Sequence, residues 1–168
     1  MRILVTVGSL PYPMDRLVGA MDAWAAGHAA HEVIMQIGYS THRPVHAAEW
    51  FDFAPFAVFQ DRFRTADVAV AHGSAGPILT ARRLGLPLVL VPRQERHGEC
   101  YNDHQCEVCE AIRGESAMRE IVLHIEDLGP ALERAIARRR DGHAYQTHRL
   151  KQRLVDTVAA FVENVARD

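Results

Sequence analysis

The sequence predicts an α/β protein built on a doubly wound parallel sheet. Short apolar runs typical of buried strands alternate along the chain with longer segments of helical periodicity. One stretch, residues 66–91, has the pattern of a complete strand–helix–strand unit, which is the building block of parallel sheets. The length of 168 residues and the hydrophobic content of 48% suit one domain with a sizeable core.

The strand–helix–strand unit has recognisable boundaries. Ala66–Ala71 is an apolar run of the right length for a buried strand, and the small-residue turn His72–Gly76 follows it. Pro77 suits the first turn of a helix, because its missing N–H would be unpaired there, and Gly85 is placed to end that helix. The expected helix and second strand are Ile78–Leu84 and Leu88–Val91.

The remaining elements follow from apolar periodicity and from Gly and Pro breakers. Further strands are expected at Arg2–Val7, Glu32–Ile37, Trp50–Phe53 and Glu120–His124. Further helices are expected at Met14–Ala26, Pro55–Thr65, Asp103–Ile112, Leu128–Arg139 and, at the C-terminus, residues 144–166. Phe56, Phe59 and Phe63 share one side of the Pro55–Thr65 helix, a stripe typical of core. Because no repeat or low-complexity linker is visible, residues 1–168 are expected to form a single domain.

Composition argues against several classes of protein. The net charge of −2 gives no nucleic-acid footprint, and the Arg138–Arg140 run is typical of a solvated helix end. No apolar run is long enough to span a membrane, and the N-terminus lacks the pattern of a secretory signal. These features predict a cytoplasmic protein, in which the three cysteines would be thiols rather than disulfides.

The turn His72–Gly76 is the first candidate site. It precedes a helix N-terminus, whose free N–H groups and partial positive charge favour a phosphate or diphosphate. Similar turns occur without a phosphate, and this one is neither Gly-x-Gly-x-x-Gly nor a Walker loop. Polar residues, among them Arg93 and Asn102–Gln105, follow the next strand. Because ligands of α/β sheets bind at the carboxyl ends of strands, we expect the turn and this polar loop to form one pocket.

A series of short motifs occurs in order over roughly residues 1–137. They are Leu4–Ser9 with Asp15–Leu17, Gln36–Gly38, Ala66–Asp67, His72–Gly76 with Ile78–Leu79, Arg83–Leu88, Val91–Arg93 and Asp103–Gln105. On these motifs the chain resembles the C-terminal domain of glycosyltransferase family 28. It is similar in particular to the small donor-binding subunits of two-subunit glycosyltransferases, such as the dolichol-linked N-acetylglucosaminyltransferase and bacterial exopolysaccharide transferases.

The resemblance implies a Rossmann-like domain that is the C-terminal, donor-binding half of a GT-B glycosyltransferase. Such an enzyme transfers a hexose or N-acetylhexosamine from a UDP-sugar to a lipid-linked acceptor with inversion, in polysaccharide or glycolipid synthesis. It typically uses no metal and no cofactor. The expected partners are a UDP-sugar and a membrane-associated acceptor-binding subunit at the inner face of the membrane, and no nucleic acid. The stripe Leu150, Leu154, Val158 and Phe161 either helps hold that subunit or packs on its own sheet.

Site residues are carried over from the resemblance by position. The residues expected to bind the donor are Gly8, Ser9, Gly73, Ser74, Ala75, Gly76, Thr80, Arg93, Asn102, Asp103, His104 and Gln105. Among them, Gly73–Gly76 would face the diphosphate, whereas Arg93 and the Asn102–Gln105 loop would face the nucleotide and sugar. His104 and Gln105 would read sugar hydroxyls, unless Asp103 only caps a helix with solvated neighbours. Relatives often have Glu at the position of Thr80, where it binds the ribose hydroxyls, so Thr is a weaker clamp.

Three further alternatives remain at this level. His72 is the candidate catalytic residue. It either offsets phosphate charge as imidazolium or hydrogen-bonds the loop backbone as neutral imidazole. A role as catalytic base is less favoured, because the resemblance places the base on the acceptor side. His97, Cys100, Cys106 and Cys109 have a zinc-like spacing, although buried cysteines also behave as small hydrophobes, and no metal is expected. Two other functions are considered for the chain: a non-catalytic module that binds nucleotide sugars, and a dinucleotide-binding domain. The turn Gly8–Pro11 lacks the glycine fingerprint of dinucleotide-binding domains, which argues against the second.

Overall fold

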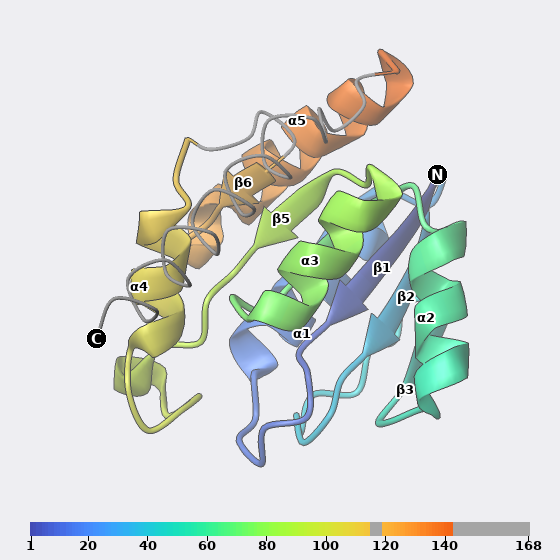
Figure 1. The fold of residues 1–168 in the computed structure, drawn as a ribbon. Coiled ribbons are helices and arrows are strands. Elements are labelled where there is room, and N and C mark those ends of the chain that lie inside the picture. Colours follow the sequence, from blue (N-terminus) through green and yellow to red (C-terminus); the bar gives the residue numbers. More distant parts are fainter. Residues whose placement is uncertain (115–118, 143–168) are drawn as a thin grey trace, which may run out of the picture.

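The computed structural model describes residues 1–114 and 119–142. Its centre is a six-stranded, all-parallel sheet of order β3-β2-β1-β4-β5-β6 (Figure 1). The strands are β1 (Arg2–Thr6), β2 (Glu32–Gln36), β3 (Glu49–Phe51), β4 (Val68–Ala71), β5 (Leu88–Leu90) and β6 (Arg119–Ile121). The strand order reverses between β1 and β4, and this switch point is where open α/β sheets bind ligands. The predicted fold class is therefore confirmed.

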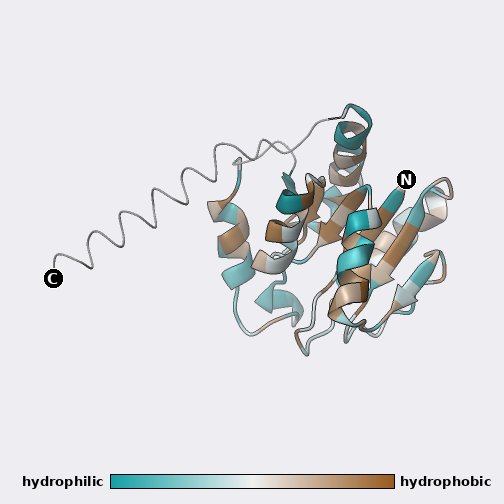
Figure 2. Cartoon of the chain, turned by 45° about the vertical axis from the view of Figure 1, so that its right-hand side comes forward, coloured by the Kyte–Doolittle hydropathy of each residue, from teal (hydrophilic) through white to brown (hydrophobic). Residues whose placement is uncertain are grey.

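Helices cover both faces of the sheet. They are α1 (Asp15–Gly27), α2 (Phe56–Thr65), α3 (Ala75–Leu84), α4 (His104–Ala111) and α5 (Leu128–Arg140), with the short 3₁₀ helices η1 (Glu95–His97) and η2 (Ile125–Asp127). Successive residues of β1 point to opposite faces: Ile3 and Val5 pack in the cluster that contains α1 and α5, whereas Leu4 packs with α2, α3 and α4. The strands are mainly hydrophobic, as expected for a sheet buried on both faces (Figure 2).

Two details differ from the sequence-based expectation. Helix α3 begins at Ala75 rather than at Ile78, so Ala75 and Gly76 belong to its first turn. The Phe stripe of α2 is only partly core: Phe63 is 2% exposed, whereas Phe56 is 74% exposed. The start of α2 follows β3 and lies at the carboxyl edge of the sheet, where its first aromatic side chain borders a pocket instead of the core.

Two arginines at the end of α5 form ion pairs with acidic residues of the same domain, as a structural role for the Arg138–Arg140 run requires. Arg138 forms an ion pair with Glu120, and Arg139 lies 3.4 Å from Asp67. No helix within residues 1–114 and 119–142 is long and apolar enough to cross a bilayer. The predicted helix at 144–166, with its stripe of apolar residues, lies outside the described residues.

Candidate donor site

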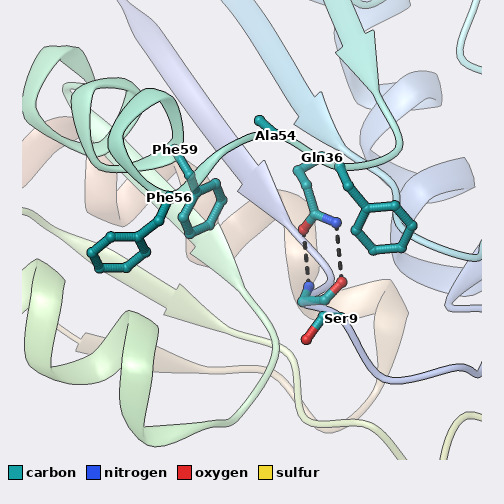
Figure 3. Close-up of a pocket in the computed structure, with 7 residues that line it drawn as sticks. Ser9, Gln36, Ala54, Phe56 and Phe59 are labelled. Atoms are coloured by element: carbon teal, nitrogen blue, oxygen red, sulfur yellow. Dashed lines mark hydrogen bonds between the residues drawn. The ribbon is translucent and has the colours of Figure 1, made fainter.

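Two pockets, of about 270 and 200 Å³, open at the carboxyl edge of the sheet beside the switch point. They share four lining residues: Gly8, Ser9, Phe56 and Phe59. The larger is completed by Gln36, Phe53 and Ala54, and several of these residues are drawn in Figure 3. The smaller reaches between α2 and α3 and is completed by Thr6, Gln60, Phe63, His72, Gly76, Pro77 and Thr80. We call the two together the α2–α3 groove.

The groove brings together part of the predicted site. Five of the predicted residues line it. Two follow β1, one follows β4 and two belong to α3: Gly8, Ser9, His72, Gly76 and Thr80. The polar residues after β5 line neither of these two pockets, so the groove contains the turn without that loop. The reason is that several side chains of the β5–α4 loop are used in bonds within the protein.

Arg93 is the clearest of these cases. Its side chain is fully buried, and its guanidinium donates to the carbonyl oxygens of Val7, Tyr12 and Glu99 at 2.8–2.9 Å. Its Nε is itself buried and has no hydrogen-bond partner within the described part of the chain. The expectation that Arg93 faces the nucleotide or sugar is therefore wrong: Arg93 ties the loop after β1 to the loop after β5.

Gln105 also contacts the backbone of the turn. Its Oε1 accepts hydrogen bonds from the N–H groups of Gly73, at 3.0 Å, and Arg93, at 3.1 Å. This joins the ends of β4 and β5 and leaves the Nε2 donor of Gln105 without a partner among the described residues. Gln105 thus retains one side-chain donor for a ligand, as the sugar-reading expectation requires.

The other residues of this loop are more exposed. The His104 ring is 70% exposed and lies 3.4 Å from the Glu107 carboxylate on the next turn of α4. Asn102 Oδ1 accepts from the backbone N–H of His104. Asp103 makes no side-chain cap bond to α4; its carboxylate instead accepts from the N–H of Glu95 at 2.9 Å. Asp103 is therefore the N-cap residue of α4 by position, but its side chain does not cap the helix.

The His72 ring lies between β1 and α3. Its Nδ1 faces the carbonyl of Thr6 at 3.4 Å, and its Nε2 lies 2.7 Å from the hydroxyl of Ser74. A carbonyl only accepts, so Nδ1 carries the proton and Nε2 accepts from the Ser74 hydroxyl. Burial, and then the charge of Arg93, lower the pKa of His72 from 6.5 to about 4. Of the two alternatives, the geometry favours the neutral imidazole that hydrogen-bonds the loop.

Helix α3 presents free donors next to this ring. Ser74 is its N-cap and makes no side-chain cap bond, because its hydroxyl is donated to His72. The N–H groups of Ala75 and Gly76, in the first turn, have no partner among the described residues. These N–H groups and the positive end of the helix dipole form the part of the groove that suits an anion.

The zinc-like spacing does not produce a metal site in the described part of the chain. Residues 1–114 and 119–142 contain no group of three or more His, Cys, Asp or Glu placed to hold a metal ion. Cys109 is fully buried beneath Gly73, and burial raises the pKa of its thiol to about 12. The Cys100 thiol donates to the carbonyl of Asn102 at 2.9 Å. These thiols act as small buried groups.

The sequence-based reasoning missed the aromatic wall of the groove. Phe53, Phe56 and Phe59 line the larger pocket. The helical spacing of Phe56 and Phe59 suggests core, and Phe53 is expected in a strand. The available signal was position: Phe53 and Phe56 stand at the end of β3 and the start of α2, on the edge where ligands bind. Gln36, buried at the end of β2, was also absent from the expected site.

Fold and site together define a Rossmann-like domain with an anion-suited groove at the switch point. The family model described as "Glycosyltransferase family 28 C-terminal domain" matches residues 2–159, and the chain belongs to this family. The domain is thus of the kind that forms the C-terminal half of GT-B glycosyltransferases. No curated protein matches the chain.

Solved structures share the fold at low sequence identity. The calicheamicin glycosyltransferase CalG4 has 23% identity and a TM-score of 0.57, covering 98% of this chain and 43% of that one. The glycosyltransferase of kitacinnamycin has 21% identity and a TM-score of 0.59, covering 84% and 37%. MurG of Acinetobacter baumannii has 18% identity and a TM-score of 0.55, covering 95% and 49%. The chain therefore spans less than half the length of these structures.

Proposed function

We propose that this chain binds a UDP-sugar in the α2–α3 groove and forms the donor half of an inverting, metal-independent glycosyltransferase. One observation carries the proposal: an aromatic pocket stands directly beside N–H groups at a helix N-terminus that have no partner in residues 1–114 and 119–142. A nucleoside diphosphate has the matching pair of parts, a planar base with a ribose and a doubly charged diphosphate. Membership of glycosyltransferase family 28 points the same way.

The parts of the donor are assigned by chemistry. The base and ribose would lie between the Phe56 and Phe59 rings and Thr80, which offers one hydroxyl. The diphosphate would face Ser9 and the N–H groups of Ala75 and Gly76. The sugar would then extend toward Gln105, whose Nε2 bonds to none of the described residues and whose Oε1 accepts from Gly73 of the same turn.

In the proposed transfer, an acceptor hydroxyl attacks the anomeric carbon on the face opposite the diphosphate. The bond from that carbon to the diphosphate oxygen breaks, and UDP leaves with the bonding electrons while a base takes the hydroxyl proton. The α3 N–H groups and the helix dipole stabilise the charge that develops on the leaving diphosphate. Neither pocket is lined by a carboxylate, and the pKa of about 4 makes His72 a poor base at neutral pH.

The base would therefore come from a partner that binds the acceptor. We propose a membrane-associated subunit that presents a lipid-linked acceptor and recruits this chain to the inner face of the membrane, in polysaccharide or glycolipid synthesis. The same lack of a base in the groove supports the second candidate, a non-catalytic module that binds nucleotide sugars and regulates a partner. A dinucleotide-binding redox role has no comparable support.

Isothermal titration of the purified chain tests the ligand class. UDP and UDP-sugars should bind in EDTA as well as in Mg²⁺, whereas NAD and FMN should bind much more weakly. A strict requirement for Mg²⁺ or Mn²⁺ would refute the metal-free mechanism. Transfer assays on a lipid acceptor separate the two candidates: the chain alone should be almost inactive in both cases, and only a transferase half gains turnover when the acceptor-binding partner is added.

A further inference from the structure

The motif Gln36–Gly38 matched the family but had no role in the expected site. Gln36 ends β2, is 4% exposed, and uses every hydrogen-bonding position of its amide. Oε1 accepts from the Thr6 hydroxyl at 2.7 Å and from the Gly8 N–H at 3.0 Å. Nε2 donates to the carbonyls of Gly8, at 3.0 Å, and Asp52, at 2.9 Å. Figure 3 shows the paired bonds to the backbone beside Ser9.

The Gln36 side-chain amide continues the hydrogen bonding between β1 and β2 by one further residue of the β1 side. The β1–β2 pairing continues to the bond from Val7 N–H to the Gln36 carbonyl, which is the last backbone hydrogen bond between the two segments. The Gln36 side chain then pairs with both the N–H and the carbonyl of Gly8, as a neighbouring strand would. The loop after β1 is therefore held in one conformation at the point where it enters the groove.

Gly8 is also confined on its other sides. Its φ is +78°, and a Cβ on it would lie 2.5 Å from the His72 ring. A Cβ on Gly38 would lie 2.9 Å from the Gly8 carbonyl, so the glycine of the motif makes room for the same loop. Gln36, Gly38 and His72 thus enclose Gly8 and determine where the next residue, Ser9, stands.

With both backbone groups of Gly8 occupied, the ligand-facing donors of the loop belong to Ser9. Its N–H and hydroxyl have no partner among the described residues, and Ser9 and Gly76 line the same pocket. We propose that Gln36 is a positioning residue: it fixes Gly8 so that the Ser9 donors and the α3 N–H groups converge on one diphosphate. This inference rests on the proposed function. Fixed donors bind an anion more tightly because little ordering remains to be done on binding.

The test compares the affinities of two ligands, UDP and uridine, for matched variants. Gln36→Met keeps the side-chain length but removes all four hydrogen bonds. Gln94→Met is the control, because Gln94 is also a buried glutamine but lies in the loop after β5. Its Nε2 donates to the Leu123 carbonyl and its Oε1 accepts from Arg96, so it makes no bond to the Gly8 loop. Gln36→Met should lose more than tenfold in UDP affinity and less than twofold in uridine affinity. Gln94→Met should match the wild type for both.

A second variant covers the case in which Gln36→Met does not fold. Gln36→Glu keeps the shape and the acceptor facing Gly8 N–H, but its second oxygen donates only when protonated. The measured quantity is the ratio of the UDP affinity of Gln36→Glu to that of the wild type at the same pH. This ratio should be low at pH 7.5 and rise toward pH 5, as the carboxyl group becomes protonated.

The inference is overturned if Gln36→Met binds UDP like the wild type, or loses UDP and uridine affinity equally. It is also overturned if the Gln36→Glu ratio does not change with pH. A wild-type protein that binds no UDP refutes the proposed function itself, and the positioning role with it, whereas normal wild-type binding with an unaffected Gln36→Met refutes the positioning role alone.

Discussion

Replacing Gly8 by alanine should separate two costs that the structure places at one residue. The first is conformational, because the φ of +78° is unfavourable for any residue with a Cβ. The second is steric: the new Cβ would stand 2.5 Å from the Cε1 and Nε2 atoms of His72, far inside ordinary contact distance. The ring cannot move away freely, because it is held by the Thr6 carbonyl and the Ser74 hydroxyl.

A matched glycine isolates the first cost. Gly98 has a similar φ of +67°, but a Cβ there would meet nothing within 4 Å. Gly98→Ala should therefore cost about 1 kcal/mol of unfolding free energy, the penalty of a left-handed conformation alone. Gly8→Ala should cost about 2–4 kcal/mol, since overpacking a tight site adds roughly 1–3 kcal/mol.

Urea unfolding followed by circular dichroism measures both values from midpoints and slopes. The double variant Gly8→Ala/His72→Ala should recover at least about 1 kcal/mol relative to the sum of the single changes, because removing the ring removes the clash. Equal costs for Gly8→Ala and Gly98→Ala, or strict additivity in the double variant, would show that His72 does not enclose Gly8 as described.

Four further outcomes are expected. The pKa of His72 is about 4 in the native protein against 6.5 when unfolded, so between these pH values the unfolded chain binds a proton that the native protein does not bind. About 3 kcal/mol of unfolding free energy, present above pH 6.5, should therefore be lost between pH 6.5 and 4 in the wild type but not in His72→Asn. Parallel pH profiles of stability for the two proteins would refute this. Cys109, with its pKa of about 12, should react with a thiol reagent at pH 8 only after unfolding, so fast native labelling at this position in a mass spectrum would contradict its burial. Thr80→Glu should raise the affinity for UDP but not for 2′,3′-dideoxy-UDP, and an equal change for both would remove Thr80 from the ribose. Gln105→Glu keeps the acceptor for Gly73 and removes the free donor, so UDP-sugar affinity should fall by about 1–2 kcal/mol more than UDP affinity, whereas equal losses would place Gln105 on the nucleotide.

The fold was predictable because its signals are local. Buried parallel strands appear as apolar runs, Pro77 lies in the first turn of α3, and Gly85 ends that helix. The site was only partly predictable, since polar residues near strand ends have two uses. Arg93 was expected on the ligand, but nothing in its local sequence reveals that its guanidinium donates to the carbonyls of Val7 and Tyr12, which are more than 80 positions away in the chain.

The aromatic residues show the converse difficulty. Phe56 and Phe63 lie on one helix with core-like spacing, yet Phe56 is largely exposed and Phe63 is buried, because only tertiary packing decides where the sheet edge falls. Gln36 was visible as part of a motif, but its pairing with Gly8 joins residues 28 positions apart. Long-range backbone pairing of this kind cannot be read from spacing.

The most direct test of the central claim is the NMR mapping of UDP binding to the ¹⁵N-labelled chain in EDTA. Saturable shifts should concentrate on the amides of Ser9, Ala75, Gly76 and Thr80 and on the start of α2, with α5 unaffected. This result would place a metal-independent nucleotide site in the α2–α3 groove. Shifts centred on another surface, or binding that appears only when Mg²⁺ is added, would contradict it.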